Sequence, residues 1–82
     1  MNLVELTQFL VENIIKESDK DKIVVSEEKN DFEIIIKVQV PEEDMSMVIG
    51  RNGAIANSIR TIVQAAAYTA KIGRVRVNID SL

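Results

Sequence analysis

One stretch of the sequence is decisive for the fold: Val48-Ile49-Gly50-Arg51-Asn52-Gly53-Ala54-Ile55. Its two glycines stand three residues apart, between a short helical pattern over residues 42–48 and a long one over residues 54–71. Glycine has no Cβ, so the backbone there can adopt left-handed angles and another backbone can come close. The second glycine also stands where the long helix begins, and the first N–H groups of a helix carry partial positive charge. The sequence therefore predicts a turn that suits a phosphate group.

Composition limits what the chain can be. Its 82 residues are enough for one domain with one core, so we expect a single domain over residues 1–82. No apolar run approaches the roughly 20 residues of a membrane span, and the N-terminus lacks the pattern of a signal peptide. The absence of cysteine excludes disulfides and thiolate metal sites, which favours a reducing cytoplasm.

Catalytic side chains are scarce. Histidine is absent, so the commonest general base and the commonest metal ligand are both missing. None of the serines has an evident base beside it in the sequence. We therefore expect neither an enzyme nor a cofactor.

Charge is divided unequally along the chain. Residues 1–44 hold five Lys against twelve Asp and Glu, a net charge of −7. Residues 45–82 hold five Lys and Arg against Asp80 alone, a net charge of +4. A molecule with this division can attract an anion on one side although its total charge is −3.

The first half predicts a helix and two strands. Residues 2–17 have helical periodicity, with Asn2 as N-cap and Glu5 three residues on, while Phe9 falls outside the apolar stripe and marks a possible partner contact. Residues 18–22 predict a loop, and residues 23–25 a short β-branched strand. Residues 32–40 alternate, so Phe32 is expected on the buried face with the four apolar residues that follow at every second position. The two strands should form an antiparallel hairpin.

Three acidic residues, Glu42, Glu43 and Asp44, follow Pro41. They could be imagined as a magnesium site, but acids in a first helical turn complement the helix dipole without any metal. We expect no metal here.

The long helix has an apolar arc and a polar ridge. The ridge residues are spaced by three or four and begin beside the glycine turn: Asn57, Arg60, Gln64, Tyr68 and Lys71. Spacing alone leaves open whether this ridge binds a ligand or is only solvated. Gly73 is expected to stop the helix, and residues 75–79 alternate as a third strand. The predicted fold is α+β, in the order α-β-β-α-α-β, with a three-stranded sheet covered on one face by three helices.

These residues resemble a known family. The run from Val48 to Gly53, followed by Ile55, Ile59 and Arg60, is similar to the I-G-x-x-G signature of KH domains, and the element order is similar to the prokaryotic type II arrangement. The whole chain resembles the small bacterial single-KH RNA-binding proteins of the KhpA type. Only three aromatic residues are present, so base stacking on the sheet in the manner of an RRM is not expected.

The resemblance implies that single-stranded RNA lies in a narrow groove and that the glycine loop clamps about four nucleotides. Main-chain N–H groups near Gly50 and Gly53 would meet phosphate, with Arg51 adding charge and Asn52 a hydrogen bond. Apolar side chains would shape the groove. The full set of expected RNA-binding residues is Val48, Ile49, Gly50, Arg51, Asn52, Gly53, Ala54, Asn57 and Arg60. Many relatives look basic where this chain has Ala54 and Asn57, so we expect weak binding by one domain and a gain from pairing.

The resemblance also implies partners and a role. Such proteins pair with themselves or with a larger KH-containing protein of the KhpB (Jag/EloR) type, and they act as post-transcriptional regulators or RNA chaperones. From the residues alone, Phe9 and the alanine-rich helix are the support for a homodimer. No membrane is implied.

Two other functions remain open. A helix-turn-helix DNA module could be built from the helices on either side of the glycines, although a DNA-reading helix normally begins with polar base-contacting residues, and this one begins Ala54-Ile55-Ala56. A protein–protein adaptor is the second, because glycine turns between helices are common. Replacing both glycines by Asp should spare partner binding by an adaptor, whereas in a clamp it should abolish RNA binding with the fold retained.

Overall fold

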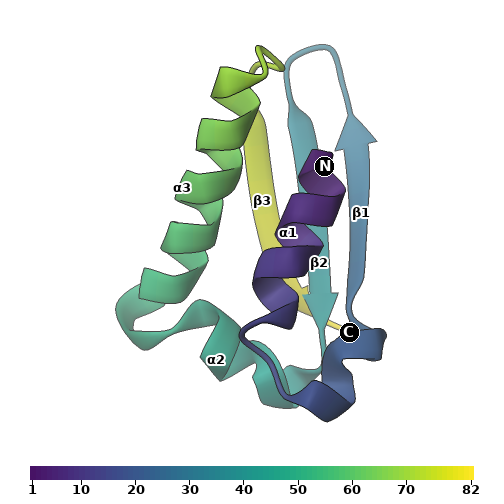
Figure 1. Ribbon diagram of the computed structural model, residues 1–82, viewed down its shortest axis with the longest axis vertical. Helices are drawn as coiled ribbons and strands as arrows, with labels where there is room; N and C mark the ends of the chain where they lie inside the picture. The colour runs from purple at the N-terminus through teal and green to yellow at the C-terminus, as the bar shows by residue number, and fades with distance from the viewer.

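Helices lie on one face of a three-stranded sheet in the computed structural model, which describes residues 1–82 (Figure 1). This is the predicted element order. The main elements are α1 (Leu3–Glu12), β1 (Val24–Lys29), β2 (Ile34–Val40), α2 (Met45–Ile49), α3 (Ala54–Thr69) and β3 (Val75–Ser81). Short 3-10 helices occupy Glu17–Lys22, Glu42–Asp44 and Arg51–Gly53.

The sheet is mixed, with the strand order β1-β2-β3. β1 pairs antiparallel with β2, as the hairpin prediction required, and β2 pairs parallel with β3. The connection between the two parallel strands contains α2, the glycine turn and α3. As a result β3 is an edge strand, and α3 lies beside it.

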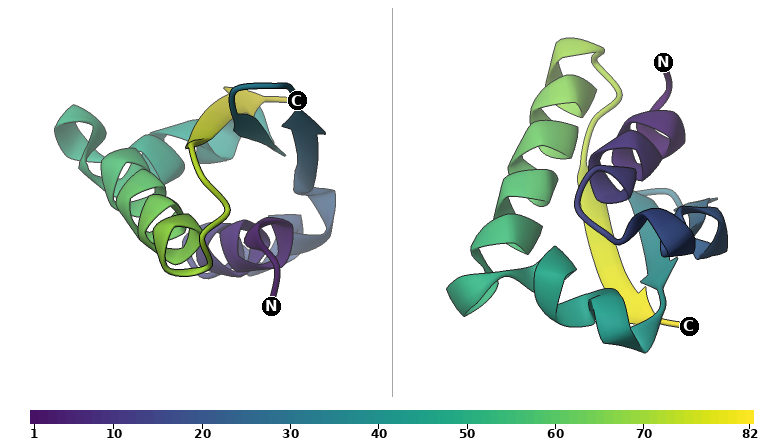
Figure 2. Two further views of the ribbon diagram at one scale, coloured as in Figure 1. Left: turned by 90° about the horizontal axis from the view of Figure 1, so that it is seen from above. Right: turned by 60° about the horizontal axis from the view of Figure 1, so that its bottom comes forward.

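The core lies between the sheet and the helices, which Figure 2 shows on one side of the strands. Ile36, Val38 and Val40 of β2 alternate into it and are fully buried, because a strand buries every second side chain. Each such side chain contributes about 1.5 to 3 kcal/mol of burial free energy. The remaining buried apolar residues are Leu3, Val11, Ile15, Ile23, Val48, Ala56, Ile59, Val63, Ala67, Val75 and Val77.

α1 begins as predicted and ends earlier. The backbone N–H of Glu5 donates to Asn2 Oδ1 at 2.8 Å, and Glu5 Oε1 accepts from the Asn2 N–H at 3.1 Å, which completes a capping box. The helix stops at Glu12 instead of residue 17, because the Asn13 side chain donates to the Phe9 carbonyl at 2.7 Å and caps the C-terminus. The predicted loop at residues 18–22 belongs to a 3-10 helix.

The hairpin departs from its prediction at the turn. Asn30 Oδ1 accepts from the backbone N–H groups of Phe32 and Glu33, at 2.8 and 2.9 Å, so these residues belong to the turn and β2 starts at Ile34. Phe32 is exposed, and its predicted place on the buried face was wrong. β1 extends to Lys29 because backbone pairing with β2 continues past its apolar residues.

α3 ends two residues before the predicted end. Lys71 takes the left-handed conformation, with φ 58°, and the Ile72 N–H reaches back to the Ala67 carbonyl at 2.9 Å. Gly73 therefore lies beyond the end of α3 and does not terminate the helix, although this had been predicted for it. No helix of the structure combines the length and the apolar character that crossing a membrane requires.

Candidate nucleic-acid interface

The glycine turn is a tight connection between α2 and α3. Gly50, Asn52 and Gly53 all have positive φ, at 76°, 56° and 77°. A Cβ on Gly50 would lie 2.8 Å from Ile55 Cβ and 2.9 Å from the Ile55 backbone nitrogen, whereas a Cβ on Gly53 would have only the Asn57 side chain near it, at 3.8 Å. Gly50 is thus required by both space and conformation, and Gly53 by conformation alone. Replacing Gly50 by Asp therefore cannot be expected to leave the fold intact.

The free N–H donors of the turn lie between the two glycines. The Gly50 N–H donates to the Ser46 carbonyl at 2.9 Å, and the Gly53 N–H donates to the Gly50 carbonyl at 3.2 Å. No protein acceptor takes the N–H of Arg51 or Asn52, and both residues are exposed. The donors that a phosphate could reach therefore belong to Arg51 and Asn52, and the glycines supply the bend.

The apolar residues of the predicted site divide into core and surface. Val48 and Ile59 are buried in the core, so the Val48 side chain, which was expected to contact RNA, offers no exposed surface. Ile49 and Ile55 are each 38% exposed and flank the turn. Ala54, at the start of α3, is exposed as well.

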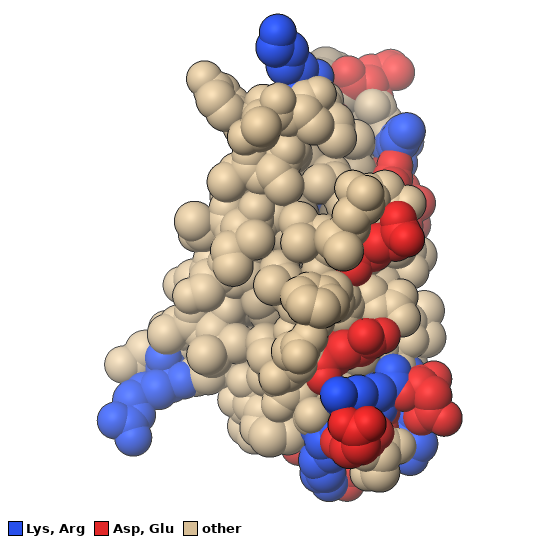
Figure 3. Space-filling model, viewed as in Figure 1, with Lys and Arg blue, Asp and Glu red and all other residues tan.

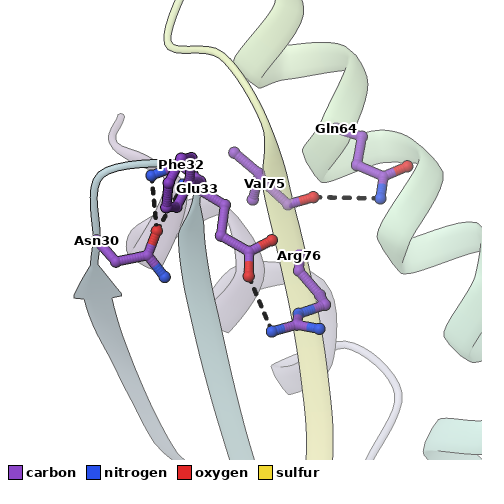
Figure 4. A network of polar contacts seen from close by, with 6 residues as sticks. All are labelled: Asn30, Phe32, Glu33, Gln64, Val75 and Arg76. Atoms are coloured by element: carbon purple, nitrogen blue, oxygen red, sulfur yellow. Dashed lines mark hydrogen bonds and ion pairs between the residues drawn. The ribbon is translucent and has the colours of Figure 1, made fainter.

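The polar ridge of α3 faces the free edge of β3. Arg60 Nε donates to the Val77 carbonyl at 3.1 Å. Gln64 Nε2 donates to the Val75 carbonyl at 3.3 Å (Figure 4). The Arg60 guanidinium also donates to Asn57 Oδ1 at 3.1 Å. Arg60 and Gln64 thus connect α3 to the edge of β3. We call this region the α3–β3 surface, formed by Asn57, Arg60, Gln64 and Tyr68 and by the edge of β3.

An open cavity of about 530 Å³ lies at the end of this surface remote from the turn. On the side of this cavity formed by the sheet, Arg76 donates to Glu33 Oε1 at 2.9 Å (Figure 4). The cavity is lined by Glu33, Gln64, Tyr68, Gly73, Arg74, Val75 and Arg76. The sequence placed Gln64 and Tyr68 on the ridge but gave no sign that Glu33 and Arg74 would join them, since their meeting depends on β3 lying between β2 and α3.

Unpaired positive charge follows the same surface. Each of the five lysines of residues 1–44, and Arg76, lies within 4 Å of a carboxylate. The four basic side chains without a carboxylate partner are Arg51, Arg60, Lys71 and Arg74. In Figure 3 acidic side chains lie along the β1 side and around the 3-10 helix Glu17–Lys22, whereas the α3 side carries basic groups only near its two ends. Because the lysines of residues 1–44 are paired with carboxylates, the positive potential at the surface comes mainly from residues 45–82.

The carboxyl groups of Asp19, Glu43 and Asp44 form the one group of possible metal ligands, with oxygens within 4.8 Å of one another. Lys22 lies 3.2 Å from Asp19, and Lys16 lies 3.6 Å from Glu43, so lysines already supply counter-charge. Asp44 is fully buried, and neither of its oxygens has a donor. Burial raises the pKa of Asp44, and the neighbouring Asp19 carboxyl raises it further, because a protonated Asp44 could donate to Asp19; the same interaction lowers the pKa of Asp19. A proton shared by the two carboxyls fits this geometry.

This fold and turn define a KH domain of type II. The family model described as KhpA/KhpB, KH domain, matches residues 5–79. The chain belongs to this family, which confirms the resemblance seen in the sequence and agrees with a non-enzymatic protein.

Several curated relatives of the chain are named RNA-binding protein KhpA. The protein from Borreliella burgdorferi is 37% identical over 82 residues, which cover 99% of this chain and 93% of that protein. The protein from Caldanaerobacter subterraneus subsp. tengcongensis is 44% identical over 64 residues, covering 76% of this chain and 85% of that protein.

Two solved structures of Era share the fold. Era in complex with MgGDPNP and nucleotides 1506–1542 of 16S ribosomal RNA has a TM-score of 0.67 at 16% identity, over 96% of this chain. An Aquifex aeolicus Era variant bound to GDP and aluminium fluoride has a TM-score of 0.69 at 15% identity, over 98% of this chain. The chain spans about three tenths of the length of each Era protein.

Proposed function

We propose that this protein binds single-stranded RNA along the α3–β3 surface, with the turn at Arg51 and Asn52 holding the phosphate backbone. The observation that carries the proposal is the pair of free, exposed N–H groups on a turn whose two other amides are already used. Relatives named RNA-binding protein KhpA and the unpaired Arg51 and Arg60 support it.

Base recognition would use the edge of β3. Successive residues of a strand point their N–H and C=O groups to opposite edges, so the groups of Val75 and Val77 face α3. A base that pairs with these groups takes over hydrogen bonds that Arg60 and Gln64 now make. Those two side chains then become free to contact phosphate or the base itself.

An NMR titration tests the proposal directly. Short single-stranded RNA of mixed sequence should shift the amide signals of Arg51 and Asn52 and the side-chain signals of Gln64, and duplex DNA should not. Unchanged signals at the turn, with RNA in large excess, would refute it.

Duplex DNA binding is less well supported. α2 has only five residues, and the ridge that would read a major groove is directed at β3, where Arg60 and Gln64 are hydrogen-bonded. A recognition helix must instead present such side chains outward.

We propose in addition that two copies pair through an uncharged face of α1 and α3. Arg60 is the only charged residue between Ala54 and Ala70, and it is directed at β3. The outer face of α3 therefore carries no charge, and together with α1 it forms the broad uncharged area of Figure 3, with Phe9 and Ile62 exposed. Pairing would join two weak RNA sites and raise the overall affinity through avidity.

We further propose that a larger KH-containing partner of the KhpB type uses the same face, and that the paired protein acts in the cytoplasm as a post-transcriptional regulator or RNA chaperone. Co-purification of RNA with the tagged protein, lost in an Arg51→Gln variant, is the expected result in cells.

A further inference from the structure

Tyr68 presents an exposed aromatic ring at the end of the α3–β3 surface. It lies one helical turn beyond Gln64 and two beyond Arg60 on the same ridge, because residues four apart are neighbours on a helix. The ring is 85% exposed, and it lines the cavity of about 530 Å³ with Gln64 and Arg74. A large aromatic side chain left this exposed contributes little to the core.

The chemistry around the ring suits a nucleobase better than a phosphate. Arg74 has no carboxylate partner, so its guanidinium plane is free to stack. Glu33 and Arg76 are paired at 2.9 Å, so neither of these charges is free to act on a ligand. One N–H of the Gln64 amide donates to the Val75 carbonyl, so the amide oxygen and the second N–H remain available for hydrogen bonds to the edge of a base.

The distance from the turn sets which nucleotide can reach Tyr68. At a rise of 1.5 Å per residue, Tyr68 lies about 20 Å along α3 from Ala54. A KH loop clamps about four nucleotides. The ring therefore lies at or beyond the end of the strand held by the turn.

We propose that Tyr68 and Arg74 form a stacking site for the base of a nucleotide outside the four at the glycine turn. The inference rests on the proposed RNA binding and adds a second contact that lengthens the site. Stacking on an aromatic ring tolerates any base, so the site adds affinity for longer RNA without adding sequence preference.

Intrinsic fluorescence offers a direct measurement, because Tyr68 is the only tyrosine and the chain has no tryptophan. An octanucleotide of mixed sequence should quench the emission and a tetranucleotide should not, with N-acetyltyrosinamide in the same RNA correcting for absorption. The octanucleotide should also bind at least about fivefold more tightly than the tetranucleotide. Tyr68→Ala should remove that gain, and Tyr68→Phe, which keeps a ring, should preserve it.

The outcomes separate this inference from the proposed function. If the octanucleotide shifts the Arg51 and Asn52 amides but neither quenches Tyr68 nor loses affinity in Tyr68→Ala, stacking is refuted and RNA binding stands. If no RNA affects the turn or the ring, both fail. Emission that changes on dilution without RNA would place the ring at a contact between copies and would also refute stacking.

Discussion

Gly50 and Ile55 lie so close that a Cβ on Gly50 would come within 2.8 Å of Ile55 Cβ. Because the Ile55 backbone nitrogen is equally near, rotation of a side chain cannot relieve the clash. Positive φ adds about 1 to 2 kcal/mol of strain for any residue with a Cβ, and overpacking adds about 1 to 3 kcal/mol. Gly50→Ala should therefore lower the free energy of unfolding by roughly 2 to 5 kcal/mol.

Gly53→Ala is the comparison at an open left-handed position, because Gly53 has ψ 11° and free space around it, whereas Gly50 has ψ 176°, a backbone conformation that essentially only glycine adopts. It should lower the free energy of unfolding by only about 1 to 2 kcal/mol. Urea denaturation followed by circular dichroism measures both variants. Equal losses would show that neither the contact with Ile55 nor the unusual ψ of Gly50 adds to the cost.

The elements predicted best were those whose pattern records burial. Ile36, Val38 and Val40 repeat every two residues and Ile59 and Val63 every four, because each element presents one face to the same core. The alternating pattern also included Phe32, but the Phe32 N–H donates to Asn30 Oδ1, so this residue belongs to the turn and lies outside β2.

The candidate site was only half visible in the sequence. The bend at the two glycines could be predicted because it depends on local backbone chemistry. Other features depend on contacts within the folded chain. The amides of Gly50 and Gly53 are already hydrogen-bonded, and Val48 is buried in the core. The side chains of Arg60 and Gln64 donate to β3. One-dimensional spacing carries no record of such contacts.

Arg51→Gln tests the charge of the turn. Loss of one charged contact to phosphate should weaken RNA binding roughly tenfold, for about 1.5 kcal/mol. It should also reduce the salt dependence of the binding constant by about 0.7 in the logarithmic slope. Fluorescence anisotropy with labelled RNA at several salt concentrations measures both.

Lys29→Gln is the control, because it makes the same charge change at a lysine paired with Glu27, remote from the turn. Its effect on affinity should be small. If both variants weaken binding alike, RNA responds to net charge and the turn has no special part.

Asp44→Asn should stabilise the protein at neutral pH. Burial raises the pKa of Asp44 above its usual 3.8, so the charged form is disfavoured in the folded state. A raised pKa contributes stability that is complete below the unfolded value and is lost as pH rises through the folded value. Asparagine carries no charge to bury, and its amide can donate to Asp19.

The pKa of Asp19 has the opposite shift, so its contribution is present above the unfolded value and is lost as pH falls through the lowered one. The advantage of Asp44→Asn should therefore be largest near pH 7 and shrink toward pH 4, measured by urea denaturation across this range. A variant that is less stable at every pH would show that the Asp44 carboxylate makes a favourable contact in its charged form.

If two copies pair through α1 and α3 as proposed, Ile62→Glu should separate them into monomers. Ile62 is 46% exposed on the uncharged outer face of α3, so a glutamate there costs the monomer little. In a dimer the same carboxylate would be buried without a partner, and the dimer dissociation constant should rise roughly a hundredfold or more. Light scattering over a concentration series measures the mass of the wild type and the variant.

Phe32→Glu is the control, because it places the same charge on an exposed apolar residue of the hairpin turn and should leave the mass unchanged. A wild type that stays monomeric at high concentration would contradict self-pairing, and a dimer that survives Ile62→Glu would move the interface to another face.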